Sequence, residues 1–423
     1  MAQIKPFKAL RFTEKAGPIG ELVCPPYDII SEEERRAYLR QNPRNVIRLE
    51  LPREGENPYL EAGRTLSEWE AEGSVAVDPT PAIYIYEEAF TAHGRSYAVK
   101  GFICRVKLEE FSAGVILPHE ETLSKAKTDR FDLMQATRCN FSQIYSLYND
   151  DGGCGELLDR LSSGAPDQEL TDGDGVTHRL WIVPENAQTA ELCRRFADKK
   201  LYIADGHHRY ETALAYRRAL AEKGEAPQSG AADYVMMCLV AMEHPGLVVF
   251  PTHRIVRGLD GFRAADVLEK CRSCFDLADL ADGKAAKAAL DAAYAAGKKA
   301  FALYSGRYTL LTLRDSSVME QLLPDASPAL RGLDVSVLHT LVLERLFGID
   351  KANMAAGKNL VYTRDEGEAV AAVDSGAADC AFLLNPTRVE EIRDVAAAGE
   401  KMPQKSTYFY PKLITGMVMN ALR

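Results

Sequence analysis

The stretch Leu201-Tyr202-Ile203-Ala204-Asp205-Gly206-His207-His208-Arg209-Tyr210 decides how this chain folds and where its chemistry lies. Its first four residues form an apolar run that is typical of a buried strand, and apolar spacing from Tyr210 onward predicts a helix to Lys223. Asp205 and Gly206 therefore stand at a strand-to-helix turn. With the mixed order of elements elsewhere, this predicts an α/β fold with a mixed sheet and some α+β character.

The residues of this turn suit an anion. The first N–H groups of a helix and its positive dipole end favour negative charge, and glycine lets a ligand approach the backbone closely. Arg209 adds a guanidinium that can bind phosphate through two donors. A helix N-terminus tends to keep a histidine neutral, so His207 and His208 are candidates to accept a proton or to ligate a metal. The alternative is that Asp205 only caps the helix and its neighbours make local hydrogen bonds.

Length and composition fit a protein of two or three domains. The chain has 423 residues, of which 46% are hydrophobic and 26% are charged, so it has material for ample cores. Its formal net charge of −10 argues against a general nucleic-acid or anionic-membrane binder. The N-terminus lacks the apolar core of a signal peptide and the nine cysteines are scattered, so a cytoplasmic location with reduced thiols is expected.

Local patterns predict the other elements and a domain boundary. A capping box at Ser31 and Glu34 predicts a helix to Asn42, and the residues 45–51 predict a strand. Further along, the patterns predict a hairpin from 82–90 and 96–108, a helix from about 124 to 147, and a helix at about 335–346. The turn at 258–261 marks the boundary, which gives domains of residues 1–259 and 260–423.

Three further polar stretches are candidates to share the site. They are residues 118–130, with His119, Glu120, Lys125 and Arg130; residues 251–254, with His253 and Arg254; and residues 402–412, with Lys405, Ser406 and Thr407. An adjacent histidine and glutamate suit a general base and a cation ligand, whereas lysine, serine and threonine donors suit phosphate oxygens. Each stretch also has a purely structural interpretation, as a charged helix start, a strand end or a capped turn.

The common phosphate-binding and hydrolase signatures are missing from the sequence. It contains no G-x-x-x-x-G-K-[ST], no G-x-G-x-x-G after a strand, no G-x-S-x-G and no H-E-x-x-H. Phosphate chemistry would therefore need a different cradle. His207 and Glu211 lie one helical turn apart and are candidate metal ligands, as is Glu120.

The ordered motifs of the chain resemble the bacterial and archaeal family known as domain of unknown function 1015. They are CPPYD at 24–28, NVIRL at 45–49, ILPHE at 116–120, ADGHHRY at 204–210, PTHR at 251–254 and the stretch 402–412. Within them, residues 205–209 are similar to the signature of the ParB/sulfiredoxin superfamily, which includes the free serine kinases. That resemblance implies a ParB/sulfiredoxin-like core with a second α/β subdomain, in which Gly206, His207, His208 and Arg209 bind nucleotide phosphates.

The leading hypothesis is a phosphotransferase that uses ATP or ADP with Mg²⁺ and acts on serine or a related small hydroxyl compound. The turn and Arg254 would hold phosphates, and Glu120 or His119 would take the hydroxyl proton. The other residues expected at the site are His208 as a catalytic group, Lys125 and Lys405 as cations that offset charge, and Asp205, Arg130, His253, Ser406 and Thr407 as cofactor contacts.

Two alternatives remain beside this hypothesis. One is a nucleotide- or metabolite-sensing protein without turnover, and the other is a metal-dependent phosphohydrolase that uses His119, His207 and Glu211. No nucleic-acid or membrane partner is expected. A homodimer is a candidate assembly.

Overall fold

The computed structural model describes residues 1–423 except 93, 123 and 226–228, and except the side chains of 124–126 and 355. The chain forms two compact units. Unit 1 contains residues 1–118, 122–248 and 411–423, and unit 2 contains residues 119–121 and 249–410. The C-terminal segment therefore returns to the unit in which the chain begins.

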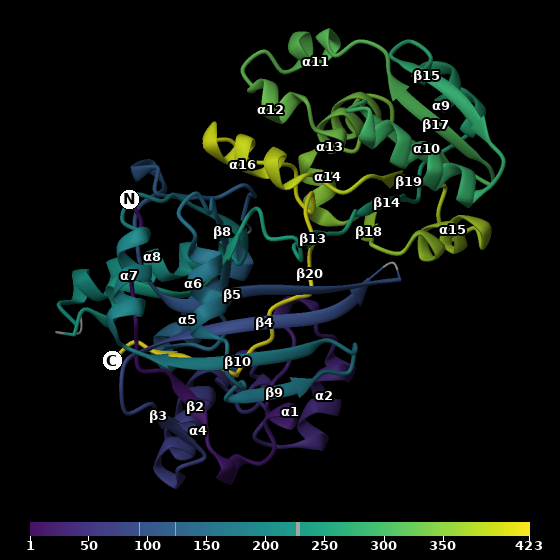
Figure 1. Ribbon diagram of the computed structural model, residues 1–423. Coiled ribbons are helices and arrows are strands. Elements are labelled where there is room, and N and C mark those ends of the chain that lie inside the picture. Colours follow the sequence, from purple (N-terminus) through teal and green to yellow (C-terminus); the bar gives the residue numbers. More distant parts are fainter. Residues whose placement is uncertain (93, 123, 226–228) are drawn as a thin grey trace. The chain divides into compact units, whose positions relative to one another are not determined.

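Unit 1 is built on a nine-stranded mixed sheet (Figure 1). The strands follow the order β6 (Ile116–Leu117), β11 (Leu201–Asp205), β8 (Ile144–Tyr148), β12 (Tyr234–Ala241), β5 (Arg95–Lys107), β4 (Ala82–Ala92), β10 (Thr177–Pro184) and β9 (Gln168–Thr171), with β1 (Ile4–Lys5) beside β5. β11 is parallel to β6 and β12 is parallel to β8, whereas the other pairs are antiparallel. The mixed α/β fold predicted from the sequence is confirmed.

The helices of unit 1 cover this sheet and build a second core. α5 (Ser124–Thr137) packs against both α8 (His207–Lys223) and α4 (Pro58–Glu72). The other helices are α1 (Ile19–Leu22), α2 (Glu32–Gln41), α3 (Ile47–Glu50), α6 (Cys154–Leu161) and α7 (Ala187–Arg195), with 3-10 turns at Glu14–Ala16, Tyr27–Ile29, Phe111–Ala113 and Ala231–Asp233. Two small ribbons pair β2 (Leu10–Phe12) with β3 (Val75–Val77) and β7 (Cys139–Asn140) with β21 (Asn420–Ala421). One core lies under the sheet, and the other surrounds Trp69 and Leu66 of α4.

Unit 2 has a six-stranded antiparallel sheet of its own (Figure 1). Its order is β15 (Phe275–Leu280), β17 (Tyr308–Leu313), β16 (Ala300–Tyr304), β19 (Cys380–Leu384), β14 (His253–Val256) and β18 (Leu360–Thr363). The helices are α9 (Ala264–Cys271), α10 (Gly283–Ala295), α11 (Ser317–Leu322), α12 (Pro328–Arg331), α13 (Asp334–Leu338), α14 (Lys351–Ala356), α15 (Glu366–Asp374) and α16 (Val389–Ala397). The short strands β13 (Val248–Val249) and β20 (Phe409–Tyr410) lie where the chain changes unit.

Several predicted elements are confirmed. The capping box of α2 is complete, because the Glu34 amide donates to Ser31 Oγ and the Ser31 amide donates to the Glu34 carboxylate. The β4–β5 hairpin and the step from β11 to α8 also lie at the predicted residues. None of the described helices combines the length and the apolar character that a bilayer span requires.

Three predicted elements are wrong in type or extent. Residues 45–51 are not a strand: the Asn45 side chain accepts from the Ile47 amide and starts the short helix α3. The helix predicted from 124 to 147 ends at Thr137, because Arg138 has a φ of 50°, and the chain continues into β7 and β8. The helix predicted at 335–346 is α-helical only through Leu338 and continues as a π-helix over His339–Glu344.

Candidate phosphate-binding turn and candidate site residues

The turn between β11 and α8 is shaped by Gly206. This residue has a φ of 94°, in the left-handed region that favours glycine. A Cβ on Gly206 would lie 2.9 Å from Nη2 of Arg209, so a larger residue would displace that guanidinium. Gly206 also has no side chain that could cap the first turn of the 17-residue helix α8. The backbone therefore meets the helix start in a compact turn over which the Arg209 guanidinium lies.

Asp205 holds two cations at this turn. Its Oδ2 accepts from Arg209 Nη2 at 3.0 Å, and its Oδ1 accepts from Lys412 Nζ at 3.0 Å. Removal from water alone would raise the pKa of Asp205, but Lys412 and Arg209 outweigh this effect and hold the pKa well below its usual range. Arg209 is also fixed by Nη1, which donates to the carbonyl of Gln143 at 2.5 Å. Asp205 and the Gln143 carbonyl thus fix Arg209, and Asp205 also fixes Lys412.

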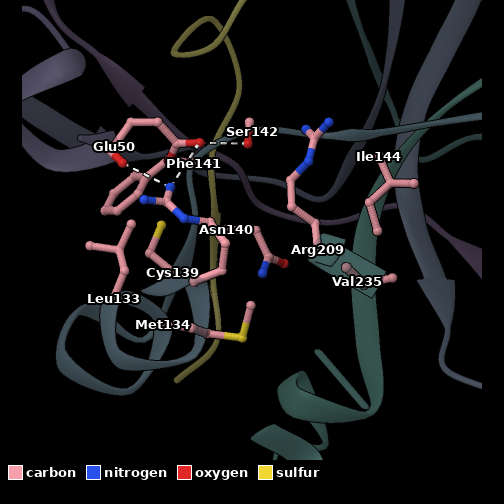
Figure 2. Close-up of a pocket in the computed structure, with 11 residues that line it drawn as sticks. Glu50, Leu133, Met134, Cys139, Asn140, Phe141, Ser142, Ile144, Arg209 and Val235 are labelled. Carbon is pink, nitrogen blue, oxygen red and sulfur yellow. Dashed lines mark hydrogen bonds and ion pairs between the residues drawn. The ribbon is translucent and has the colours of Figure 1, made fainter. Parts of the chain in front are cut away.

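Arg209 also lines a small cavity of about 30 Å³, which is room for one or two water molecules (Figure 2). Glu50 and Ser142 line the same cavity, and Ser142 Oγ donates to Glu50 Oε1 at 2.8 Å. Burial raises the pKa of Glu50, although nearby Arg130 opposes the rise. Our sequence analysis did not single out Glu50 or Ser142. The available signal was a carboxylate that follows the apolar residues Ile47 and Leu49 in α3.

Arg130 belongs to a buried network around this cavity. Its Nη1 donates to the carbonyl of Glu50 at 2.8 Å, and its Nη2 pairs with Asp129 Oδ2 at 2.5 Å. The guanidinium carbon lies 3.9 Å from the ring centre of Tyr27. These contacts give Arg130 a packing role in unit 1, whereas Arg209 stands at the turn itself.

The first turns of α8 contain the other predicted residues of unit 1. His207 is buried and His208 is half-buried. Glu211 accepts from Thr122 Oγ1 at 2.9 Å and from Lys127 Nζ at 2.8 Å. The side chain of Lys125 lies outside the described residues. Within the described part of the chain, no group of three histidine, cysteine or carboxylate side chains gathers to hold a metal ion.

In unit 2, two predicted stretches lie side by side. Residue Glu120 forms a parallel bridge with Met402, and Glu120 Oε1 accepts from the amide of Lys405 at 3.2 Å. His119 is buried, and its Nε2 lies 3.0 Å from Thr407 Oγ1. Lys405 has a φ of 57°, which is a strained value for a residue with a Cβ. Ser406 Oγ donates to the carbonyl of Pro403 and so helps to close this turn.

Arg254 is a buried cation of unit 2. It is 1% exposed, and its two terminal nitrogens donate to the carbonyls of Thr252 and Lys405. Its Nε has no partner among the described atoms. Burial lowers the pKa of Arg254 to about 10. Burial and the Arg254 charge lower the pKa of the adjacent His253 to about 4, and its Nδ1 lies 3.1 Å from the Leu384 amide.

Comparison with known proteins identifies the family. A family model described as "Protein of unknown function (DUF1015)" matches residues 4–336. The chain belongs to this family. The match includes the β11–α8 turn with Asp205 and Arg209, and it ends before Lys412. The family resemblance inferred from the ordered motifs is confirmed.

Several solved structures resemble this chain at low sequence identity. A conserved hypothetical protein from Pyrococcus furiosus is 15% identical, with a TM-score of 0.37, over 76% of this chain and 95% of its own. A free serine kinase in complex with AMP is 15% identical, with a TM-score of 0.34, over 74% of this chain and 87% of its own. SbnI from Staphylococcus aureus, with a C-terminal truncation, is 11% identical, with a TM-score of 0.37, over 75% of this chain and 86% of its own. No curated protein matches this DUF1015 chain.

Proposed function

We propose that this protein binds nucleotide phosphates at the β11–α8 turn and transfers a phosphate to a small hydroxyl compound. One observation carries the proposal: Asp205 holds both Arg209 and Lys412 at a glycine turn that starts a long helix. An isolated cation on a surface would need no such anchor. Two anchored cations at a helix N-terminus form a site prepared for an anion.

The charge balance of the turn favours a phosphate. Arg209 and Lys412 bring two positive charges to the turn, Asp205 brings a negative charge, and the helix adds the equivalent of about half a positive charge at its N-terminus. Among the bonds described for the protein, Arg209 uses two of its five N–H donors, to Gln143 and Asp205. The others are available for bidentate contact with phosphate oxygens.

Transfer of the phosphate would depend mainly on positioning and on charge neutralisation. Arg209 and Lys412 would offset the charge that develops on the phosphate oxygens. Mg²⁺ that accompanies a nucleotide needs only one or two protein carboxylates besides the phosphates, and Glu211 is our candidate because it lies one turn into α8. ATP or ADP as donor and a serine-like acceptor stay predictions, as do the catalytic roles of Glu120, His119 and His208.

Binding tests the first half of the proposal. Replacing Arg209 with alanine removes a guanidinium that donates to phosphate, so we expect Arg209→Ala to bind ADP and ATP at least about tenfold more weakly by calorimetric titration, which corresponds to about 1.4 kcal/mol. Arg64→Ala is the matched control, because Arg64 is exposed on α4 and only pairs with helix neighbours. Unchanged affinity in Arg209→Ala would remove the turn as the phosphate site.

Turnover tests the second half. Labelled ATP or ADP, with Mg²⁺ and a panel of amino acids and sugars, should give a labelled product that depends on the acceptor. We expect Glu120→Gln to reduce this turnover with little change in nucleotide affinity, as a lost general base would. Tight nucleotide binding without product from any acceptor would overturn the transferase and favour the sensing protein.

A further inference from the structure

A groove lies between α5 and α8, on the same helix whose start forms the proposed phosphate site. It has a volume of about 530 Å³, within the range of small-molecule pockets. Its walls include Phe111, Phe131, Leu214 and Ala215, with Lys127 and Glu211 at one end. Neither the sequence motifs nor the proposed phosphate site accounts for this groove.

Aromatic side chains with fixed orientations form the walls of the groove. Phe111 stacks on the buried Tyr210 with ring centres 5.2 Å apart and an angle of 25° between the rings. Phe131 packs edge-on against the buried Tyr216, at 6.4 Å and 71°. Both phenylalanines are only half-buried, so they keep ring surface exposed to the groove. Such surface suits a flat aromatic ligand.

Ion pairs mark both ends of this aromatic surface. Lys127 Nζ lies 2.8 Å from Glu211 Oε2 at the end toward the start of α8. Arg218 pairs with Glu110 at the opposite end. The groove therefore combines an apolar middle with polar groups at its ends, which fits a ring system that has hydrogen-bonding edges.

The geometry of α8 connects the groove with the phosphate site. Glu211, Leu214, Ala215 and Arg218 recur at intervals of three or four residues, so they share one side of the helix. Helical rise places Ala215 about 13 Å along the axis from Gly206, and a rotation of about 100° per residue places it half a turn around that axis. A nucleoside diphosphate that passes around the start of α8 would have its phosphates at the turn and its base against the phenylalanines. Lys127 would then lie between the base and the phosphates of this ligand, nearer to the phosphates.

We infer that the α5–α8 groove binds the base and ribose of the nucleotide whose phosphates occupy the β11–α8 turn. This inference rests on the proposed function. It adds that the nucleoside itself contributes to affinity, through ring stacking on Phe111 and Phe131. The protein should therefore prefer ADP to inorganic pyrophosphate, which presents two phosphates and no nucleoside.

Two tyrosine substitutions on α8 test the groove. Ala215 is exposed and lies in the groove wall, so Ala215→Tyr fills the groove without disturbing the core. Ala221→Tyr is the matched control, at an exposed position of the same helix that does not line the groove. Calorimetric titration of each variant with ADP and with pyrophosphate, both with Mg²⁺, separates the two parts of the ligand. We expect Ala215→Tyr to bind ADP at least about tenfold more weakly and pyrophosphate unchanged.

The outcomes distinguish this inference from the proposed function. If the wild-type protein binds neither ligand, or if Arg209→Ala binds both as the wild type does, the phosphate site itself is wrong. If both phosphate ligands bind and Arg209→Ala weakens both, the site stands. In that case, the groove assignment fails if ADP binds no more tightly than pyrophosphate, or if Ala215→Tyr binds ADP as well as Ala221→Tyr does.

Discussion

At the scale of single residues, Arg254 differs from the other buried arginines in its surroundings. Arg35 and Arg130 each face a carboxylate, on Glu54 and Asp129. Among the described residues, Arg254 lies near carbonyl oxygens, an aromatic ring at 5.2 Å, His253 and His339, whose ring nitrogens have no described partner. A buried charge without a counter-charge costs stability. We therefore expect Arg254 to contribute little to the stability of the fold.

This view predicts that Arg254→Met leaves the free energy of unfolding within about 1 kcal/mol of the wild type, because the relief of the buried charge offsets the two lost hydrogen bonds. Urea denaturation measures it. Arg35→Met provides the contrast: it removes a buried partner of Glu54 and of the Leu51 carbonyl, and we expect it to cost about 2 kcal/mol or more. A loss of about 3 kcal/mol in Arg254→Met would show that Arg254 stabilises the fold.

At the scale of elements, the contact between α4 and α5 depends on one glycine. Gly63 lies within α4, and a Cβ at this position would come 2.5 Å from the carbonyl oxygen of Ala136 on α5. The two helices therefore approach more closely than any other residue would permit. Because α5 also packs against α8, this contact supports the helix that carries the β11–α8 turn.

We expect Gly63→Ala to lower the free energy of unfolding by about 1–3 kcal/mol, because the helices must separate to admit the methyl group. In an open helix the same change would stabilise the protein by about 1 kcal/mol, so the sign of the effect is decisive. Gly173→Ala is the control, since a Cβ there meets nothing within 4 Å, and it should change stability by less than about 0.5 kcal/mol. Stabilisation in Gly63→Ala would contradict the close approach.

At the scale of the whole molecule, each unit has its own hydrophobic core. In unit 1, Leu239 of β12 lies in the core under the mixed sheet and is 0% exposed. In unit 2, Leu383 of β19 lies in the core of the antiparallel sheet and is 1% exposed. A unit with a separate core has its own source of stability.

Differential scanning calorimetry of Leu239→Ala and Leu383→Ala should show this separation. Each substitution creates a cavity and should cost about 2–5 kcal/mol in its own unit. We expect Leu239→Ala to lower mainly one unfolding transition and Leu383→Ala mainly the other. A single transition that both variants lower to the same extent would mean that the units unfold together.

Local sequence patterns were sufficient for several parts of the fold. The Ser31 capping box, the β4–β5 hairpin and the β11–α8 turn follow from neighbouring residues, because helix caps, strand alternation and turn glycines act over a few positions. The family followed from the order of short motifs, and its model matches residues 4–336. The prediction failed for residues 45–51, where an Asn45 side-chain bond to the Ile47 amide stabilised a short helix in an apolar stretch.

The turn at residues 205–209 was determined by the sequence alone, because its glycine, its arginine and the helix start are adjacent in the chain. Only the tertiary structure decided which distant groups meet that turn. Lys412 reaches Asp205 across 207 residues, and Arg209 shares a cavity with Glu50 and Ser142. The physical reason is that contacts between residues far apart depend on the path of the whole chain, whereas periodicity and capping report only on near neighbours.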